Sequence, residues 1–164
     1  MNKNSNIGFV GLGNMGKPIF DNLNKEFSNV FCFDKDTSKL KINKFSSSLN
    51  EIFEKCKIII FCIESNEQIV DIIKENAIKK NTIIIDLTSS LPELTKQISS
   101  YLKIFGSHYI DAGMSGGALG ASNGTLTLML GGSKTICKKI DFILKTFAKN
   151  IFYLGKSGNG HLMK

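Results

Sequence analysis

The stretch Ile7-Gly8-Phe9-Val10-Gly11-Leu12-Gly13-Asn14-Met15-Gly16 places a glycine-rich loop directly after a short apolar run. A helical pattern follows over residues 15–27, so the order is strand, tight turn and helix. In this order Gly11 permits the turn, Gly13 lets a pyrophosphate approach the backbone, and Gly16 lets the helix pack closely on the strand. Backbone N–H groups at the start of such a helix favour bound phosphate. We therefore expect a dinucleotide site formed by Gly11, Leu12, Gly13, Asn14, Met15 and Gly16.

An acidic residue ends the next predicted strand. Asp34 follows Val30-Phe31-Cys32-Phe33 and lies 18 residues after Gly16 (34 − 16), close to the spacing of about 20 at which a carboxylate holds the adenosine ribose. Such a carboxylate repels a 2′-phosphate, and the chain has no arginine, because all 21 basic residues are lysines. The sequence favours NAD as cofactor. Lys35 leaves NADP possible, and a plain surface turn is the alternative for Asp34.

Composition narrows the class of protein. A chain of 164 residues usually forms one domain. Its net charge of +7 comes from scattered lysines, whereas nucleic-acid readers depend on arginine, so we expect no nucleic-acid partner.

No apolar run approaches the roughly 20 residues that span a membrane, and the N-terminus has no signal-peptide core, so we expect a cytoplasmic protein. The cysteines lack metal or redox spacing and are interpreted as buried thiols, with no metal site: Cys32, Cys56, Cys62 and Cys137.

Strand and helix patterns alternate along the chain. Apolar, β-branched runs predict buried strands over residues 57–63, 82–86, 108–110, 125–130 and 151–154. Helices are predicted over residues 48–55, 65–76, 90–101 and 134–147. Three of these have capping patterns at their starts, namely Ser48 with Glu51, Ser65 with Gln68, and Ser90 with Glu93 beside Pro92. The alternation predicts an α/β fold with a doubly wound, mostly parallel, Rossmann-like sheet.

A second glycine-rich region begins at Asp111-Ala112-Gly113-Met114-Ser115-Gly116-Gly117 and extends to Gly120. We expect a long loop here, of the kind that is more often functional than not. Ser115 and the two glycines after it offer a hydroxyl and exposed N–H groups to a carboxylate or hydroxyl ligand. Ser115 lacks the G-x-S-x-G elbow of a nucleophile, and neither His108 nor His161 has an evident triad partner.

Four motifs in this order resemble the β-hydroxyacid dehydrogenase family, which includes 3-hydroxyisobutyrate dehydrogenases and 6-phosphogluconate dehydrogenases. The G-x-G-x-M-G pattern matches residues 11–16, and D-x-S-T-x-x-P is similar to residues 86–92. The substrate loop and the strand after it are similar to residues 111–132. The catalytic G-x-G-x-x-x-K pattern matches Gly158-Asn159-Gly160-His161-Leu162-Met163-Lys164. Imine reductases are a weaker resemblance, because they usually lack this lysine.

The resemblance implies roles for the matching positions. Lys164 would be the catalytic acid/base, and Ser115, Gly116 and Gly117 would bind substrate. Ser89 would lie beside the nicotinamide ribose, with Ile63 and Glu64 along the cofactor. The sequence departs from the family at Glu64, where proline is usual, while Gly113 and His161 are closer to the 6-phosphogluconate branch. We expect a dinucleotide-binding domain over residues 1–160 and the start of an interdomain helix over 161–164, with the family's C-terminal helical domain absent.

The function implied is hydride transfer between NAD(P) and a small hydroxyacid or aldehyde-acid, such as 3-hydroxyisobutyrate and its semialdehyde. Two alternatives remain, a 6-phosphogluconate dehydrogenase-like enzyme and a non-catalytic dinucleotide-binding module. Because the family's helical domain completes the substrate site and builds the dimer, we expect the chain alone to turn over little. We expect a homo-oligomer only together with that domain.

Overall fold

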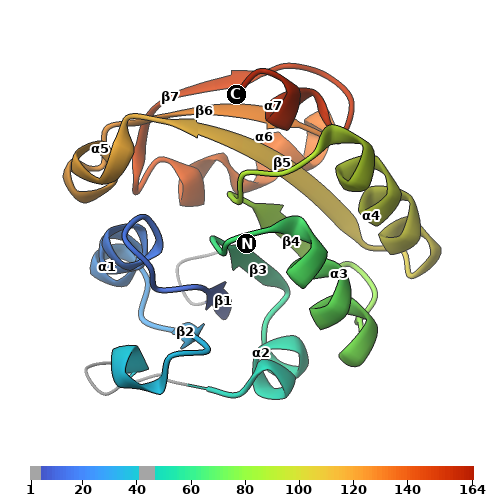
Figure 1. The fold of residues 1–164 in the computed structure, drawn as a ribbon, viewed down its shortest axis with the longest axis horizontal. Helices are drawn as coiled ribbons and strands as arrows, with labels where there is room; N and C mark the ends of the chain where they lie inside the picture. Colours follow the sequence, from blue (N-terminus) through green and yellow to red (C-terminus); the bar gives the residue numbers. More distant parts are fainter. Residues whose placement is uncertain (1–4, 41–46) are drawn as a thin grey trace.

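The computed structural model describes residues 5–40 and 47–164. Its strands are β1 (Ile7–Val10), β2 (Val30–Phe33), β3 (Ile58–Phe61), β4 (Ile83–Asp86), β5 (His108–Ser115), β6 (Leu126–Gly131) and β7 (Ala148–Tyr153). Its α-helices are α1 (Gly16–Glu26), α2 (Leu49–Lys55), α3 (Asn66–Glu75), α4 (Pro92–Ile104), α5 (Gly117–Asn123), α6 (Lys134–Leu144) and α7 (Asn159–Leu162), and Thr37–Leu40 form a 3-10 turn. Figure 1 shows their arrangement.

In the described residues the strands form one sheet in the order β2-β1-β3-β4-β5-β6-β7. Neighbouring strands are parallel, except that β5 pairs with β6 in antiparallel register. The predicted doubly wound, mostly parallel sheet is therefore confirmed. After β2 the chain returns to the other side of β1, so the order reverses between β1 and β3. Ligands of open α/β sheets bind at such a reversal, outside the carboxyl ends of the strands.

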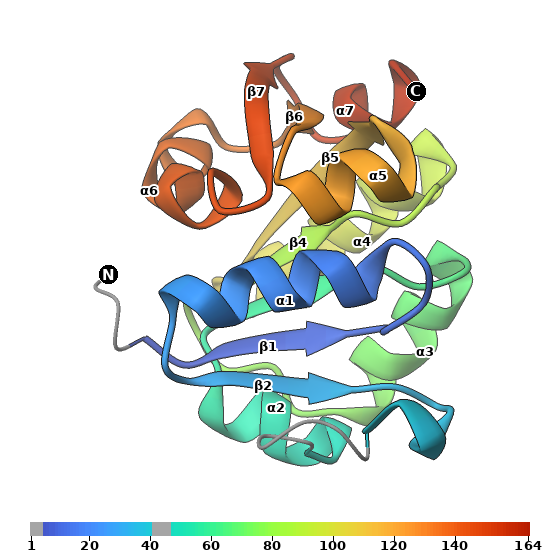
Figure 2. The same cartoon turned by 90° about the vertical axis from the view of Figure 1, so that its left-hand side faces the viewer.

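Helices cover both faces of the sheet (Figures 1 and 2). One face packs against α1, α5 and α6, and the other against α2, α3 and α4. Strands β1, β3 and β4 are buried along their whole length, which explains why their sequences are continuous apolar runs rather than alternating ones. Each fully buried isoleucine of β3 contributes roughly 1.5–3 kcal/mol of hydrophobic free energy, so this centre holds the ends of the strands in place.

The prediction of a long loop over residues 111–120 is wrong. Strand β5 continues to Ser115 and pairs with β6, with Asp111 opposite Gly131 and Ser115 opposite Thr127. Helix α5 then begins at Gly117. Small residues explain the difference, because a Cβ on Gly113 would lie 2.5 Å from the Gly160 carbonyl oxygen. Glycine there marks close strand and helix packing instead of an irregular loop.

The predicted helix starts are correct in part. The capping box of α2 is confirmed, with the Glu51 N–H donating to Ser48 Oγ (3.2 Å) and the Ser48 N–H to Glu51 Oε2 (3.4 Å). Ser65 is the N-cap of α3, but its side chain makes no capping hydrogen bond. Ser90 is not the cap of α4, which is Leu91, because the Ser90 hydroxyl donates to the buried Asp86 carboxylate (3.1 Å).

No helix within residues 5–40 and 47–164 is both long enough and apolar enough to cross a membrane. The domain predicted over residues 1–160 includes residues 1–4 and 41–46, which lie outside the described residues. The start of an interdomain helix is predicted over residues 161–164, and the helix in this part of the chain is α7, which begins two residues earlier and ends at Leu162.

Candidate functional site

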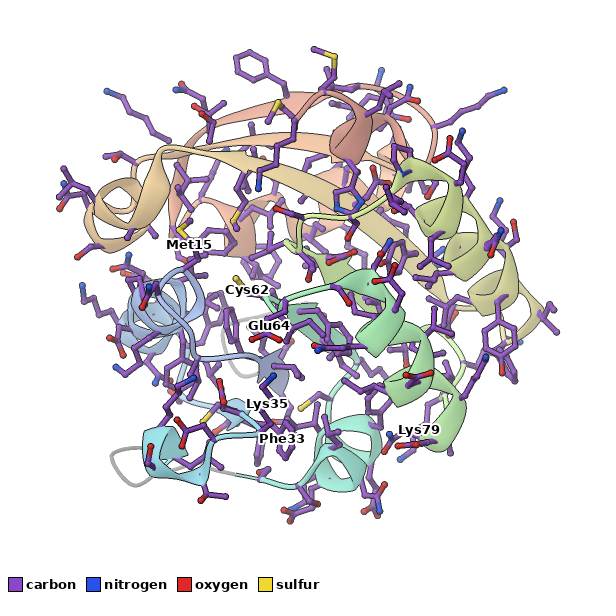
Figure 3. The ribbon with its side chains drawn as sticks, in the orientation of Figure 1. Met15, Phe33, Lys35, Cys62, Glu64 and Lys79 are labelled. Carbon is purple, nitrogen blue, oxygen red and sulfur yellow. The ribbon has the colours of Figure 1, made fainter. Side chains whose placement is uncertain are left out.

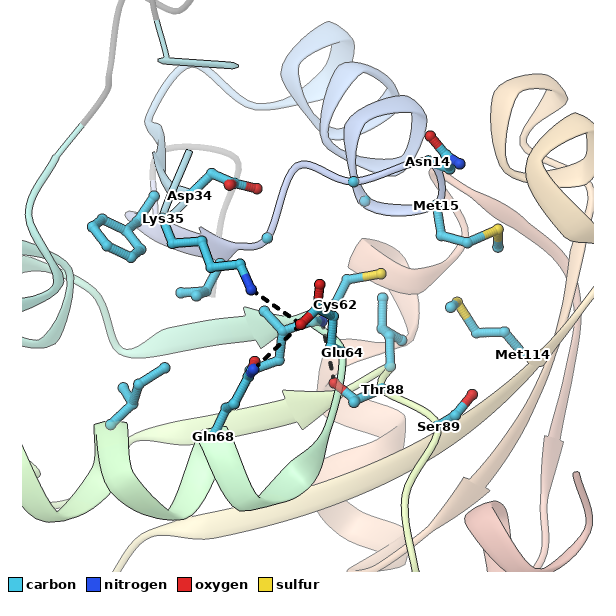
Figure 4. Close-up of a pocket in the computed structure, with 18 of the residues that line it drawn as sticks. Asn14, Met15, Asp34, Lys35, Cys62, Glu64, Gln68, Thr88, Ser89 and Met114 are labelled. Carbon is cyan, nitrogen blue, oxygen red and sulfur yellow. Dashed lines mark hydrogen bonds and ion pairs between the residues drawn. The ribbon is translucent and has the colours of Figure 1, made fainter. Parts of the chain in front are cut away.

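A crevice of about 830 Å³ opens at the carboxyl ends of the first five strands. Its volume lies within the 300–1,000 Å³ that is usual for small-molecule sites. It lies at the reversal between β1 and β3, where this class of sheet binds ligands. Figure 3 shows Met15, Cys62, Glu64, Lys35 and Phe33 following one another along it. Figure 4 gives the close-up.

The glycine loop after β1 forms one wall of the crevice. Gly11 has a φ of +100°, and a Cβ there would overlap the Cys62 carbonyl at the end of β3. A Cβ on Gly16 would overlap the Gly11 carbonyl oxygen. By contrast, a Cβ on Gly13 would meet no protein atom within 4 Å. The protein's own packing therefore requires Gly11 and Gly16, whereas Gly13 leaves open space toward the crevice, as a bound pyrophosphate needs.

Asp34 joins this loop to the end of β2. The residue is 6% exposed, and its Oδ2 accepts the Leu12 N–H at 2.6 Å while Oδ1 accepts the Asp36 N–H at 2.8 Å. Lys39 Nζ lies 3.5 Å from Oδ1. Asp34 also lines the crevice, so one carboxylate both orders the glycine loop and faces the ligand space. Leu12 itself turns its side chain into the core and contributes its backbone N–H.

An ion pair crosses the opening between β2 and β3. Lys35 Nζ lies 3.0 Å from Glu64 Oε2, and Gln68 Nε2 donates to the same oxygen at 3.4 Å (Figure 4). The hydrogen bond from Lys35 lowers the pKa of the Glu64 carboxyl, so Glu64 is charged at neutral pH. All three side chains line the crevice.

The far wall comes from the ends of β3 and β4. The Ile63 N–H donates to Thr88 Oγ1 at 3.3 Å, which ties these two ends together. Ser89 follows, and its Oγ accepts a hydrogen bond from Lys164 Nζ at 2.6 Å. Both Ser89 and Lys164 line the crevice, so the C-terminal lysine meets the predicted cofactor site directly.

Ser115, Gly116 and Gly117 line the same crevice at the end of β5. Gly116 and Gly117 have φ values of +124° and +60°, a backbone conformation that side chains disfavour. A Cβ on Gly117 would meet no protein atom within 4 Å. The predicted substrate residues and Lys164 thus lie around one ligand space.

Asp111 holds the segment that carries Lys164. Its carboxylate is fully buried and accepts the N–H groups of Gly158 (2.9 Å), Gly160 (2.8 Å) and His161 (3.2 Å). A Cβ on Gly131 would come within 2.5 Å of Asp111 Oδ2, so the glycine gives the carboxylate room. Sequence reasoning identified Asp111 only as the start of a motif and missed this role. The signal available was an acidic residue directly after the strand predicted over residues 108–110.

A second buried polar cluster lies beside this segment. His161 Nδ1 lies 2.8 Å from Thr95 Oγ1, and its Nε2 lies 3.3 Å from the Asp86 carbonyl and 3.7 Å from Asp86 Oδ2. The Tyr109 hydroxyl donates to Asp86 Oδ2 at 2.5 Å. Burial raises the pKa of Asp86, and burial together with the Asp86 charge raises the pKa of Tyr109. The partners of His161, not evident in the sequence, join the helix before Lys164 to α4 and to the end of β4.

Within residues 5–40 and 47–164, no group of three or more His, Cys, Asp or Glu side chains could hold a metal ion.

Cys62 lies on the crevice wall, and burial raises the pKa of its thiol to about 12. It is therefore an uncharged wall group at neutral pH.

Comparison with known proteins gives three kinds of match. Residues 6–155 match the family described as the NAD binding domain of 6-phosphogluconate dehydrogenase. A 2-(hydroxymethyl)glutarate dehydrogenase from Eubacterium barkeri is 34% identical across 100% of the chain, which covers 58% of that protein. A mitochondrial 3-hydroxyisobutyrate dehydrogenase from Drosophila melanogaster is 31% identical over 97% of the chain and 52% of that protein.

Among solved structures, a 3-hydroxyisobutyrate dehydrogenase from Mycobacterium tuberculosis, determined with L-serine, has a TM-score of 0.92 at 24% identity. The match covers 98% of this chain and 57% of that one. At 24% identity, this similarity shows a shared fold only. The chain spans between about half and three-fifths of the length of these relatives.

Proposed function

The chain belongs to the family of the NAD binding domain of 6-phosphogluconate dehydrogenase, and on this premise we propose that it serves an NAD-dependent dehydrogenase of small β-hydroxyacids. The observation that carries the proposal is the hydrogen bond of 2.6 Å between Lys164 Nζ and Ser89 Oγ. It places an amine on the wall of the crevice into which the glycine loop opens. A base and a cofactor site in one ligand space are what alcohol oxidation needs.

The residues of the first wall fit a dinucleotide. Gly13 leaves space for the pyrophosphate, the start of α1 supplies N–H groups, and Asp34 faces the crevice with a carboxylate suited to ribose hydroxyls. Bound NAD supplies the hydride acceptor. Ile63 and Glu64 line the crevice after β3 and are proposed to lie along the cofactor, and the Ser89 hydroxyl on the far wall is proposed to lie beside the nicotinamide ribose.

Lys164 is proposed to move the proton. During oxidation its amine accepts the proton of the substrate hydroxyl, and during reduction its ammonium returns a proton to the carbonyl oxygen. Ser89 holds Nζ at the crevice wall, and the buried Asp111 fixes the helix before it through backbone N–H groups. The hydroxyl of Ser115 and the backbone at Gly116 and Gly117 are proposed to bind the substrate carboxylate.

The proposed substrate is a short β-hydroxyacid such as 3-hydroxyisobutyrate. The relatives that support it are named for 2-(hydroxymethyl)glutarate and 3-hydroxyisobutyrate. The rival assignment is 6-phosphogluconate, for which the family description is the supporting observation.

The test uses the complete gene product, supplied with NAD and a panel of 3-hydroxyisobutyrate, 2-(hydroxymethyl)glutarate and 6-phosphogluconate. Lys164→Ala should lower kcat by roughly 10²–10⁴-fold, the usual share of a general acid/base, while the Kd for NADH stays within about twofold. Lys156→Ala is the matched control, because Lys156 is exposed and does not line the crevice. Cofactor binding without turnover of any hydroxyacid would instead indicate a non-catalytic module.

A further inference from the structure

We propose that Glu64 is a determinant of cofactor choice, acting by holding Lys35 away from the position that the 2′-phosphate of NADP would occupy. The inference rests on the proposed function, because it concerns the same crevice. It assigns a role to the glutamate in the connection between β3 and α3.

The contact that carries the inference joins two strand ends. Lys35 directly follows Asp34, the residue expected at the ribose hydroxyls, yet its ammonium is directed to Glu64 Oε2 at 3.0 Å. Gln68 donates to the same oxygen at 3.4 Å and fixes the carboxylate from the first turn of α3. Figure 4 shows Lys35 extended from the end of β2 toward Glu64 and away from Asp34.

Lys39, a second lysine that lines the crevice, is also paired with acidic side chains. Lys39 Nζ lies 3.5 Å from Asp34 Oδ1 and 4.0 Å from Asp36 Oδ2. Among the described residues that line this rim of the crevice, the carboxylates of Asp34, Glu64 and Asp71 outnumber the ammonium groups of Lys35 and Lys39, which gives a formal charge of −1 (2 − 3). NADP differs from NAD only by a phosphate on the adenosine 2′-oxygen, so a rim with this charge repels NADP.

The ion pair has no packing role that would explain it. The side chains of Lys35 and Glu64 are 70% and 74% exposed, and exposed pairs contribute little to stability. Replacing Glu64 by glutamine should therefore leave folding unchanged. It should free the flexible Lys35 stem to turn toward a 2′-phosphate and raise the formal rim charge to zero.

The experiment titrates the chain with NADH and with NADPH by cofactor fluorescence. Glu64→Gln should raise the ratio of NADPH affinity to NADH affinity about three- to tenfold, the effect of one unit charge near a phosphate in a solvent-exposed, partly screened setting. Glu75→Gln is the matched control, because Glu75 ends the helix that follows Glu64, is exposed and does not line the crevice. It should change neither affinity.

A double-mutant cycle assigns the effect to Lys35. Lys35→Gln should reverse the NADPH gain in the Glu64→Gln background and have a smaller effect on NADPH binding in the parent, where Lys35 is held by Glu64. A gain that persists without Lys35, or an unchanged ratio of NADPH to NADH affinity in Glu64→Gln, overturns the inference while leaving the proposed function intact. Failure of the parent chain to bind NADH overturns both.

Discussion

Two backbone segments beside the crevice, the glycine loop over residues 11–16 and the segment over residues 158–164, are each held by an aspartate at a strand of the sheet. In the first, Asp34 accepts the Leu12 N–H of the glycine loop. In the second, Asp111 accepts the N–H groups of the segment that carries Lys164. The difference is in where the carboxylates face: Asp34 lines the crevice, whereas Asp111 is fully buried. One carboxylate therefore orders backbone and also faces the crevice, whereas the other orders backbone in the interior of the fold.

The glycines in and beside the crevice fall into two groups, those packed against backbone and those that face open space. Gly16 and Gly160 leave no room for a Cβ, which would overlap a backbone carbonyl oxygen in each case. Gly13 and Gly117 line the crevice, and a Cβ added to either would have no neighbour within 4 Å. Glycine is therefore found in two settings here, where backbones approach one another and where space at the crevice is open, and substitutions can distinguish the two.

The largest expected effect is at the buried anchor. Asp111→Ala removes the carboxylate that accepts three backbone N–H groups, so these buried donors lose their hydrogen-bond partner. The free energy of unfolding should fall by about 3–5 kcal/mol. Urea denaturation followed by circular dichroism measures it. Asp141→Ala is the control, because its pair with Lys145 is an exposed i,i+4 contact worth about 0.5 kcal/mol. Equal losses in the two variants would contradict the anchoring role.

The next largest effect is a difference in stability between substitutions at Gly16 and at Gly13, both in the glycine loop over residues 11–16. Gly16→Ala forces a Cβ against the Gly11 carbonyl and should lower the free energy of unfolding by about 2 kcal/mol, as overpacking does. Gly13→Ala should change it by less than about 0.5 kcal/mol, because Gly13 is not among the glycines of positive φ and has open space. Thermal melts of the two variants check this, and a larger loss in Gly13→Ala would reverse the interpretation.

Asp34→Asn should lower the free energy of unfolding and also weaken NADH binding, with a smaller loss of stability than Asp111→Ala or Gly16→Ala. The amide has a single acceptor oxygen for the two N–H donors, so we expect a loss of about 1–2 kcal/mol in the free energy of unfolding. NADH binding should also weaken, by about tenfold, since a hydrogen bond to a charged group contributes about 1.5–3 kcal/mol. Asp36→Asn, on the exposed turn beside it, should leave NADH binding within about twofold. A loss of stability without weaker NADH binding would make Asp34 a structural anchor like Asp111.

The smallest effect depends on pH and concerns Cys62, which is next to Gly11 on the crevice wall. Burial raises the pKa of this thiol from 9.0 to about 12, so the folded state keeps a proton that the unfolded state loses above pH 9. The contribution of the protonated Cys62 thiol to the free energy of unfolding is complete below pH 9. It is lost as pH rises, so that the free energy of unfolding is lower by about 1.4 kcal/mol at pH 10. The stability difference between the parent and Cys62→Ser should therefore narrow between pH 8 and pH 10, and a constant difference would contradict the pKa.

The sheet class and its elements were predictable because the buried parallel strands are continuous apolar runs, of which Ile58 to Phe61 is the clearest. The glycine loop and Asp34 were recognisable from the order of strand, turn and helix together with the spacing of Asp34 after the loop. The extension of β5 to Ser115 was not, because glycine signals equally a loop and a close approach of backbones. The contacts of Asp86 with Tyr109 and His161 join residues 23 and 75 positions apart, and a single sequence contains no signal for such pairs.

The most direct test of the central claim, that the crevice binds a dinucleotide at the first glycine loop, is a fluorescence titration with NADH of the parent chain and of Gly13→Ala. We predict saturable binding by the parent and an affinity at least about tenfold weaker in Gly13→Ala, because the added methyl group fills the space of the pyrophosphate, with superimposable melting curves. Equal NADH affinity in the two proteins, or no binding by the parent, would contradict the account.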